Sequence, residues 1–239
     1  MRKSVAALIA ASALSGCQVH AQEDAGRTVS RNYQVGNFQQ IEVAGPYDVD
    51  VRTGSNVSVS AKGGEKLLDR TTVEVNGDKL VIRPERNHSF FNFGWSHHGK
   101  ASFVVTVPAL SAATIAGSGD IRIDKVAGQN FDGTVAGSGG LEVASVDVQQ
   151  LKLAIAGSGG VKAAGKAQSA KYDIAGSGDV NAGALQTQDL KASIAGSGGI
   201  KAHSSGNADV SIMGSGDVEV TGGAKCKVSK AGSGDVRCS

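Results

Sequence analysis

The tetrapeptide Ala-Gly-Ser-Gly recurs along the second half of this chain and constrains its fold more than any other feature. It occurs six times between residues 116 and 234, and Met-Gly-Ser-Gly occurs once at 213–216. The first glycines of the seven copies are separated by 20, 20, 19, 20, 18 and 18 residues. A period of this length is typical of stacked repeats rather than of a single globular core.

The segments on either side of each copy show the periodicity of β-strands. LKLAI (151–155) precedes one copy and GVKA (160–163) follows it, and apolar residues alternate with polar ones in both. Each unit is therefore predicted to be a strand, a tight turn and a second strand. Because such short strands cannot bury their own apolar face, we expect an all-β fold in which the units stack as a single-stranded parallel β-helix. The coils of this solenoid would contain 18–20 residues.

The repeated tetrapeptides would then lie above one another as a ladder of turns. Their serine hydroxyls can both donate and accept, so we expect this file to hydrogen-bond from coil to coil. The next residue is Asp at 120, 179, 217 and 235 and Gly in the other three copies. We expect each Asp to hydrogen-bond within its own turn. The pattern does not fit a calcium-binding β-roll, which repeats every nine residues with a fixed Asp.

The first part of the chain contains a degenerate copy of the repeat. IEVAGPYDVDV (41–51) aligns with TIAGSGDIRI, which places Ala44 over Ala116 and Val49 over Ile121. End units of solenoids are usually atypical, because one of their faces meets water. We therefore predict one domain over residues 33–239, with irregular β coils at 33–110 and regular coils at 111–239.

The last copy also departs from the pattern. Lys230 stands where earlier coils have isoleucine, as suits a terminal coil with an open face. Cys226 and Cys238 lie six residues on either side of Gly232, at positions that alternation places inside the coil. We predict that they form a disulfide that closes the last coil; the alternative is two separate thiols.

The first residues have the composition of an export signal. Arg2 and Lys3 precede the apolar run VAALIAASAL, which is too short to span a bilayer as a helix. The following Leu-Ser-Gly-Cys resembles the lipobox of bacterial lipoprotein precursors. The resemblance implies a signal peptide at 1–16, lipidation of Cys17 and a polar tether over 17–32, with Gln18 favouring the outer membrane. Cleavage after Ala21, which would release a soluble periplasmic protein, is the alternative.

The charge of the mature chain argues against a nucleic-acid partner. Residues 1–16 contain two of the 24 basic residues and none of the 22 acidic ones, so 22 of each remain. A nucleic-acid-binding domain normally carries a basic surplus, and this chain has none.

The segment RNHSFFNFGWSHHGK (86–100) differs sharply in composition from the rest of the chain. It holds four of the ten aromatic residues of the chain and three of its five histidines, and it lies between two predicted strands, so it is expected to be a loop. The candidate ligand or partner residues are Phe90, Phe91, Phe93, Trp95, His97 and His98. Loops on rigid scaffolds often carry function, and aromatic clusters bind sugars and partners. The segment could equally be an apolar cap over the open end of the solenoid, and a metal site is the third alternative.

Several segments together resemble a known bacterial family. FQQIEVAGPYDVDVRTG, KLVI, SFVVTVPAL and the serial AGSGD and GSGG turns are similar to the auto-transporter adhesin, head GIN domain family, over about residues 38–220. The resemblance implies an exported β-helical domain, often on a lipoprotein, with an adhesin-like role. It brings no catalytic motif and no cofactor.

The sequence therefore supports a binding, adhesion-like or structural module of the cell envelope, without catalysis and without a cofactor or metal. Its partners would be the lipid bilayer, through the acylated Cys17, and a glycan or another envelope protein. The domain could face the periplasm or the cell surface. The alternative function is a periplasmic carbohydrate-active enzyme built on a β-helix, since many β-helices carry such sites.

Overall fold

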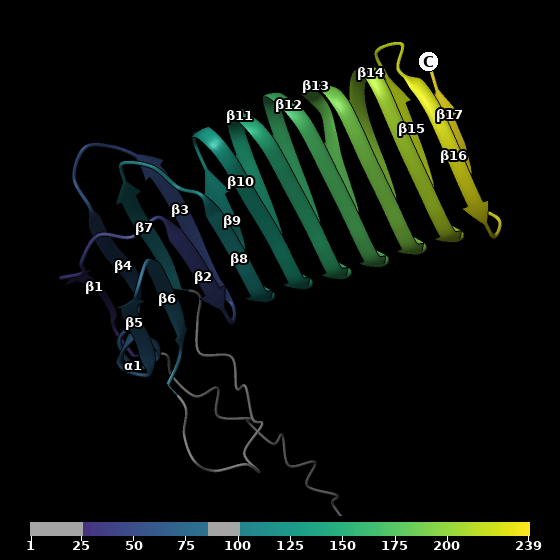
Figure 1. Ribbon diagram of the computed structural model, residues 1–239. Coiled ribbons are helices and arrows are strands. Elements are labelled where there is room, and N and C mark those ends of the chain that lie inside the picture. Colours follow the sequence, from purple (N-terminus) through teal and green to yellow (C-terminus); the bar gives the residue numbers. More distant parts are fainter. Residues whose placement is uncertain (1–25, 86–100) are drawn as a thin grey trace, which may run out of the picture.

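The computed structural model describes residues 26–85 and 101–239 (Figure 1). The strands of its N-terminal part are β1 (Thr28–Tyr33), β2 (Gln40–Ala44), β3 (Tyr47–Thr53), β4 (Ser58–Gly64), β5 (Thr71–Asn76), β6 (Lys79–Pro84) and β7 (Ala101–Val107), with the helix α1 (Glu65–Asp69) between β4 and β5. The solenoid strands are β8 (Ala112–Gly117), β9 (Ile121–Ile123), β10 (Val126–Gly137), β11 (Gly140–Gly157), β12 (Gly160–Gly176), β13 (Asp179–Gly196), β14 (Gly199–Gly214), β15 (Asp217–Thr221), β16 (Lys225–Ala231) and β17 (Val236–Cys238).

The second half of the chain is a β-solenoid of about six turns, with coils roughly 20 residues apart. Neighbouring coils pair in parallel, so that Gly137 lies beside both Gly117 and Gly157. The long strands β11 to β14 each run around most of one coil, and their turns line up along one edge (Figure 1). The predicted parallel stacking and the turn ladder are confirmed.

The interior of the solenoid is filled by files of aliphatic side chains. Ile155, Ile174 and Ile194 occupy the same position in successive coils, and each is at most 3% exposed. Tyr172 is fully buried in the same interior, and its hydroxyl has no hydrogen-bond partner. Burial raises the pKa of this phenol, because the charged form cannot be solvated there.

The turns require glycine at two positions for different reasons. The first glycine of each tetrapeptide has a positive φ, for example +131° at Gly137, which L side chains rarely adopt. The second glycine approaches the neighbouring coil, and a Cβ on Gly139 would lie 2.1 Å from the carbonyl oxygen of Gly119. Only glycine therefore fits either place in a stacked turn.

The turn ladder is held by backbone rather than by serine side chains. The N–H of Ser138 donates to the carbonyl of Gly117 at 2.9 Å, and the same bond recurs up the ladder to Ser233. Within residues 116–239, all of which the structure describes, no hydroxyl of this serine file makes a hydrogen bond. The predicted coil-to-coil bonding through hydroxyls is therefore wrong, because the backbone amides already make those links and the serines point to solvent.

The degenerate first copy pairs as its alignment predicts. Ala44 lies beside Ala116, and Val49 lies beside Ile121. Gly45 takes the place of a turn glycine and donates its N–H to the carbonyl of Ala116. The strands β2 and β3 therefore continue the parallel solenoid into the N-terminal part.

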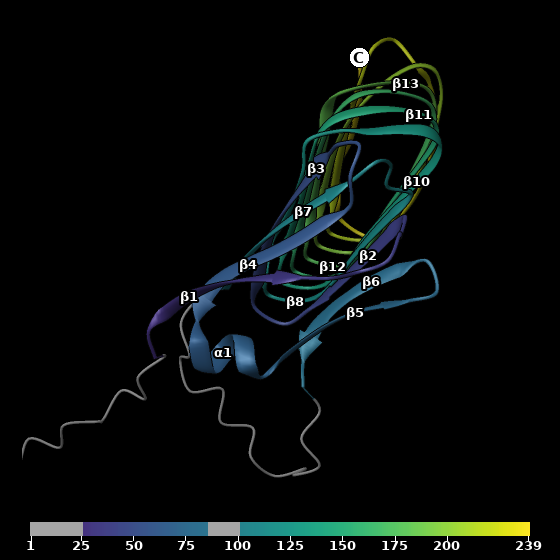
Figure 2. The same ribbon diagram turned by 90° about the vertical axis from the view of Figure 1, so that its left-hand side faces the viewer.

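The rest of the N-terminal part is a mixed sheet, which corrects the prediction of irregular coils over 33–110 (Figure 2). β1, β4 and β7 pair antiparallel, and so do β5 and β6. The turn Asn76-Gly77-Asp78, with Gly77 at φ +65°, closes the β5–β6 hairpin. The strand β1 also lies inside the segment predicted as a tether over 17–32, because it finds an edge of β4 to pair with.

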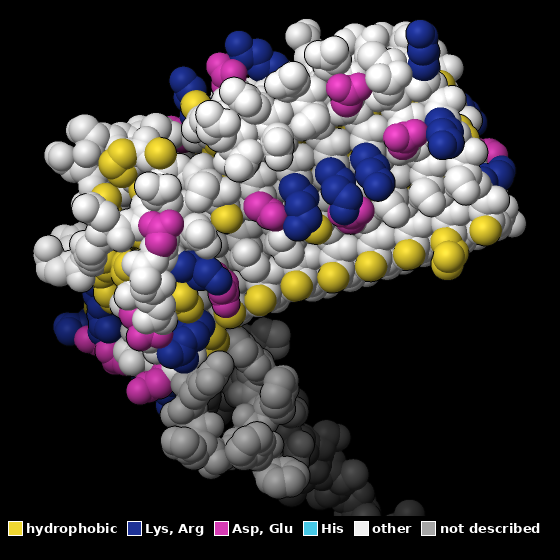
Figure 3. All heavy atoms as spheres, in the orientation of Figure 1, with side chains coloured by type: hydrophobic (Ala, Val, Ile, Leu, Met, Phe, Trp, Pro, Cys, Tyr) yellow, Lys and Arg dark blue, Asp and Glu magenta, His cyan; other side chains and the backbone are white. Residues whose placement is uncertain are grey.

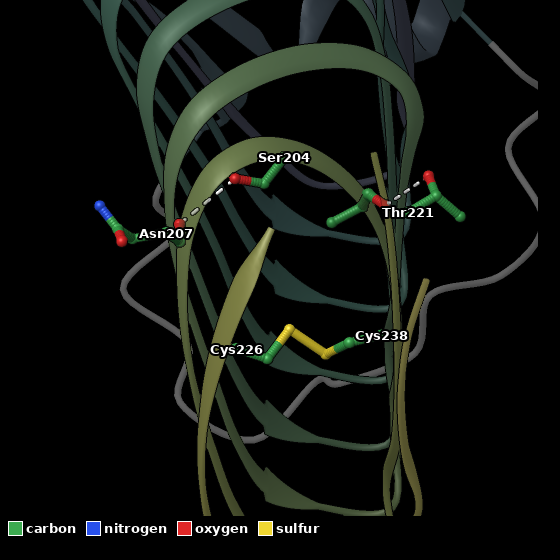
Figure 4. Close-up of a disulfide and its surroundings, with 6 residues drawn as sticks. Ser204, Asn207, Thr221, Cys226 and Cys238 are labelled. Atoms are coloured by element: carbon green, nitrogen blue, oxygen red, sulfur yellow. Dashed lines mark hydrogen bonds between the residues drawn. A yellow bond between two sulfur atoms is a disulfide. The ribbon is translucent and has the colours of Figure 1, made fainter. Parts of the chain in front are cut away.

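The last coil is closed by the predicted disulfide between Cys226 and Cys238 (Figure 4). It joins β16 to β17 across the end of the solenoid, where Ser204 and Thr221 hydrogen-bond to the backbone of Asn207 and Ala202. The structure also confirms that Lys230 occupies the position that isoleucine holds in earlier coils. Lys230 lies beside Ile212 and donates from Nζ to the carbonyl of Gly234 at 2.8 Å.

Candidate functional site

Two groups of sequence-predicted residues lie outside the described residues. Cys17 is the predicted lipidation site, and the aromatic segment 86–100 is the predicted partner loop. The residues of that loop are Phe90, Phe91, Phe93, Trp95, His97 and His98. Both sites stay predictions, and the described surface that can bind a partner is that of the solenoid.

The residues after each GSG turn form a file on one wall of the solenoid. Its aspartates accept, through Oδ1, the backbone N–H of the residue at the same position in the next coil, each at 2.8 Å. These bonds join Asp120 to Gly140, Asp179 to Gly199, and Asp217 to Asp235. The prediction that each Asp bonds its own turn is therefore wrong, because the nearest free amide belongs to the coil above.

The same bonds explain why Asp and Gly share this file irregularly. A Cβ on Gly140 would lie 2.9 Å from the carboxylate of Asp120, so glycine relieves crowding there, whereas the terminal coil accommodates the Cβ of Asp235 beside Asp217. Where a coil has glycine at this position, the backbone N–H of the equivalent residue in the next coil donates to a backbone carbonyl instead, as from Gly160 to Gly139 at 3.1 Å. These aspartates are primarily coil-to-coil links.

A groove of about 390 Å³ crosses the C-terminal half of this wall and four consecutive coils. Its polar lining combines acidic and basic side chains. They are Asp179, Lys201, Asp217, Glu219, Asp235 and Arg237. A second groove, of about 340 Å³, crosses the N-terminal half of the same wall near Arg122 and Lys162.

The opposite wall, which leads into the turns, carries a groove of about 500 Å³ that is lined from six successive coils. Lys152, Lys171 and Lys191 line it in consecutive coils, beside Gln150 and Ser169. Figure 3 shows basic and acidic side chains gathered along the middle of this wall, above a row of small apolar side chains that follows the turn edge. That row consists of the alanines of the AGSG turns and Met213, which is 69% exposed.

Sequence reasoning did not single out these lysines, although a signal for them exists. Each stands five residues before the first glycine of its turn, at Gly157, Gly176 and Gly196. In a solenoid, equal offsets from the turn mean that residues share a file. The offset therefore places the three ammonium groups side by side.

Within 26–85 and 101–239, no group of three or more His, Cys, Asp or Glu side chains is placed to hold a metal ion. His203 lies apart from the aspartate file and contacts Thr221 at 3.2 Å. Over the same ranges, no helix has the length and hydropathy of a membrane span.

The geometry defines an all-β solenoid with a mixed-sheet N-terminal part and long, polar walls. A family model described as "Putative auto-transporter adhesin, head GIN domain" matches residues 37–224. The chain therefore belongs to this family, as its sequence motifs suggest. Membership implies an exported or cell-surface protein. No curated protein is found to match the chain.

Solved structures share the fold. A "putative adhesin" from Bacteroides fragilis matches with a TM-score of 0.81 and 23% identity, over 90% of this chain and 99% of that one. A "Putative lipid binding protein" from Parabacteroides distasonis matches with a TM-score of 0.69 and 23% identity, over 90% and 97%. A "putative adhesin" from Parabacteroides merdae has a TM-score of 0.70 and 17% identity, over 90% and 97%. These similarities concern the fold alone.

Proposed function

We propose that this protein is a lipid-anchored β-helical module of the cell envelope that binds a partner and does not catalyse a reaction. One observation carries the proposal: each groove on the two walls extends across four to six consecutive coils. A groove of this shape suits an extended partner better than a small substrate, which an enzyme usually encloses in a concave pocket. The family description, which names adhesion and no reaction, agrees.

The aspartate file supports the same proposal. A glycosidase needs two carboxyl groups that are free to act as acid and base or nucleophile. Here Asp120, Asp179 and Asp217 each hold a backbone N–H of the next coil with one oxygen, as part of the architecture. Because these carboxylates already hold backbone N–H groups, this wall is better suited to binding a partner than to catalysing a reaction.

Anchoring completes the proposal. The lipobox-like Leu-Ser-Gly-Cys places an acyl chain on Cys17 and gives the protein its bilayer contact, with the outer membrane as the site. The first described strand, β1, begins at Thr28, so the chain from Cys17 to this strand is the tether.

Protease treatment of intact cells tests where the module works. An epitope is inserted at residues 20–22 of the tether, and its loss is followed with a periplasmic protein as the lysis control. We expect cleavage in unbroken cells, together with weaker attachment of a deletion strain to host glycans or matrix. Protection until the outer membrane is permeabilised, with unchanged attachment, would overturn the adhesin function.

A carbohydrate-active enzyme is the second candidate, favoured by the groove that combines Asp217, Glu219 and Asp235 with Lys201 and Arg237. This function predicts release of reducing sugar ends from an envelope polysaccharide. The release should be lost in Glu219→Gln and Asp235→Asn. Binding to a polysaccharide with no release of sugar ends would exclude it and leave the binding module.

A further inference from the structure

Three lysines form a continuous row on the groove-bearing wall that leads into the turns. Lys152 pairs in register with Lys171, and Lys171 pairs with Lys191, in three consecutive coils. Neighbouring strands lie about 4.8 Å apart, so three ammonium groups project from a strip roughly 10 Å long. Asp132 and Asp209 occupy the same file in the coils before and after, so they bound the row at its two ends.

Such a row has a physical cost. Like charges directly opposite one another on neighbouring strands destabilise a sheet. The outward file on the other wall avoids this, because charges of the same sign never occupy adjacent coils. Its members are Arg122, Glu142, Lys162, Asn181, Lys201, Glu219 and Arg237. One wall of the solenoid therefore avoids like charges in adjacent coils, and the other wall does not. Departures from such local rules typically occur at functional sites.

Neighbouring carboxylates compensate the row only in part. Lys152 lies 3.2 Å from Asp132, and Lys171 lies 2.5 Å from Asp173. Both pairs are solvent-exposed, with the lysine side chains 51% and 45% accessible, so each is weak and open to exchange. Lys191 forms no ion pair with any residue that the structure describes.

The surroundings suit a polymer that carries hydroxyl groups as well as charge. Gln150 and Ser169 line the same groove beside the lysines in one neighbouring file, which Asp189 continues in the next coil, where its carboxylate accepts a hydrogen bond from Asn207 Nδ2 at 3.0 Å. An amide and a hydroxyl can donate to and accept from sugar hydroxyls. The row therefore offers one cation per coil, with hydrogen-bonding groups alongside.

We propose that this row binds an acidic polysaccharide, whose regularly spaced carboxylate or sulfate groups each meet one lysine. The chain of the polymer would lie along the solenoid axis, in the groove that is lined from six coils. This proposal rests on the binding function proposed above and names the chemistry of the partner.

Retention of the mature chain on immobilised polygalacturonate, with neutral dextran as the reference polymer, tests the proposal. The row is neutralised by Lys152→Gln, Lys171→Gln and Lys191→Gln. The matched control neutralises the same number of exposed charges outside the grooves described above, by Lys62→Gln, Lys125→Gln and Lys166→Gln. All three proteins are compared at increasing salt, with their unfolding temperatures measured alongside.

We expect wild type and control to bind polygalacturonate. The row variant should bind more weakly by a factor of about ten or more, and its binding should depend less on salt. Equal binding by all three proteins, equal loss in both variants, or no binding to the acidic polymer would overturn the proposal. Binding only to vesicles that contain phosphatidylglycerol would overturn it as well. If only the row proposal failed, the attachment of cells, which is measured separately, would still be weaker in the deletion strain than in the wild type.

Discussion

The carboxylate of Asp179 accepts the backbone N–H of Gly199, which occupies the same position one coil further along, at an N···O distance of 2.8 Å. Asp120 and Asp217 make the same bond to the next coil. The relationship couples two residues that are 20 positions apart in sequence. It makes the choice of residue in one coil depend on the residue in the coil before it.

Replacement of Gly199 by alanine should therefore cost stability, whereas replacement of Gly160 should not. A Cβ on Gly199 would lie 2.9 Å from Asp179 Oδ1, so the carboxylate has to shift and its hydrogen bond is weakened, at a cost of about 0.5–1.5 kcal/mol. A Cβ on Gly160 meets nothing nearer than 3.9 Å, so Gly160→Ala should be neutral or stabilising by about 0.5–1 kcal/mol. Urea unfolding of both variants checks this.

The double variant Asp179→Ala/Gly199→Ala supplies the control for the mechanism. If the carboxylate is the obstacle, removal of Asp179 should reduce the additional cost of Gly199→Ala. Strictly additive losses would mean that the backbone of the coil, not this side chain, requires the glycine.

The turn ladder should tolerate loss of a serine hydroxyl but not a methyl group on its second glycine. Ser197→Ala keeps the backbone bond from residue 197 to Gly176 and should change the free energy of unfolding by less than about 0.5 kcal/mol. Gly198→Ala would place a Cβ 2.0 Å from the carbonyl oxygen of Gly178, which cannot move away. This variant should lose more than about 4 kcal/mol or fail to fold. Thermal unfolding followed by circular dichroism distinguishes the two, and a strongly destabilised Ser197→Ala would refute the backbone account.

The buried hydroxyl of Tyr172 should be dispensable. It has no hydrogen-bond partner, so Tyr172→Phe removes the cost of its desolvation and should stabilise the protein by about 1 kcal/mol. Tyr47 is the matched control, since its hydroxyl lies 3.0 Å from Thr71 Oγ1 and Tyr47→Phe should lose about 1 kcal/mol. Denaturant midpoints of the two variants should move in opposite directions. A loss of stability in Tyr172→Phe would reveal a partner for this hydroxyl.

The disulfide should protect the last coil rather than the whole molecule. It closes a loop with a sequence separation of 12, and Cys226→Ala/Cys238→Ala should destabilise that coil by about 2–3 kcal/mol. In a solenoid each coil contacts only its neighbours, so the loss should stay local. Hydrogen exchange should become faster over residues 225–239 and remain unchanged over 140–176. Uniformly faster exchange would show that the solenoid unfolds as a single unit.

The regular coils could be predicted from the sequence because each of them repeats the same local requirement. The spacing of the GSG turns and the alternation in segments such as LKLAI determine both the stacking and the register. The placement of Cys226 and Cys238 follows from that register, since both occupy inward positions of one coil.

The N-terminal part could not be predicted to the same extent, because its pairing depends on contacts between strands that share no repeat. VEV and KLVI are recognisable as strands, but the hairpin between them depends on the turn Asn76-Gly77-Asp78. The partner of β1 is β4, a pairing that no period in the sequence indicates. The lysine row has a sequence signal, its constant offset from the turns, which acquires meaning only when coils are stacked.

Because the turns stack in register, the length of the molecule can change by whole coils. Because Gly157 and Gly176 lie beside one another as equivalent positions, deletion of residues 158–176 would remove one whole coil and join two backbones that already follow the same path. Each coil gained or lost by duplication or deletion would move the far tip by about 4.8 Å and leave the core intact. Such a protein can change its length without redesigning its fold.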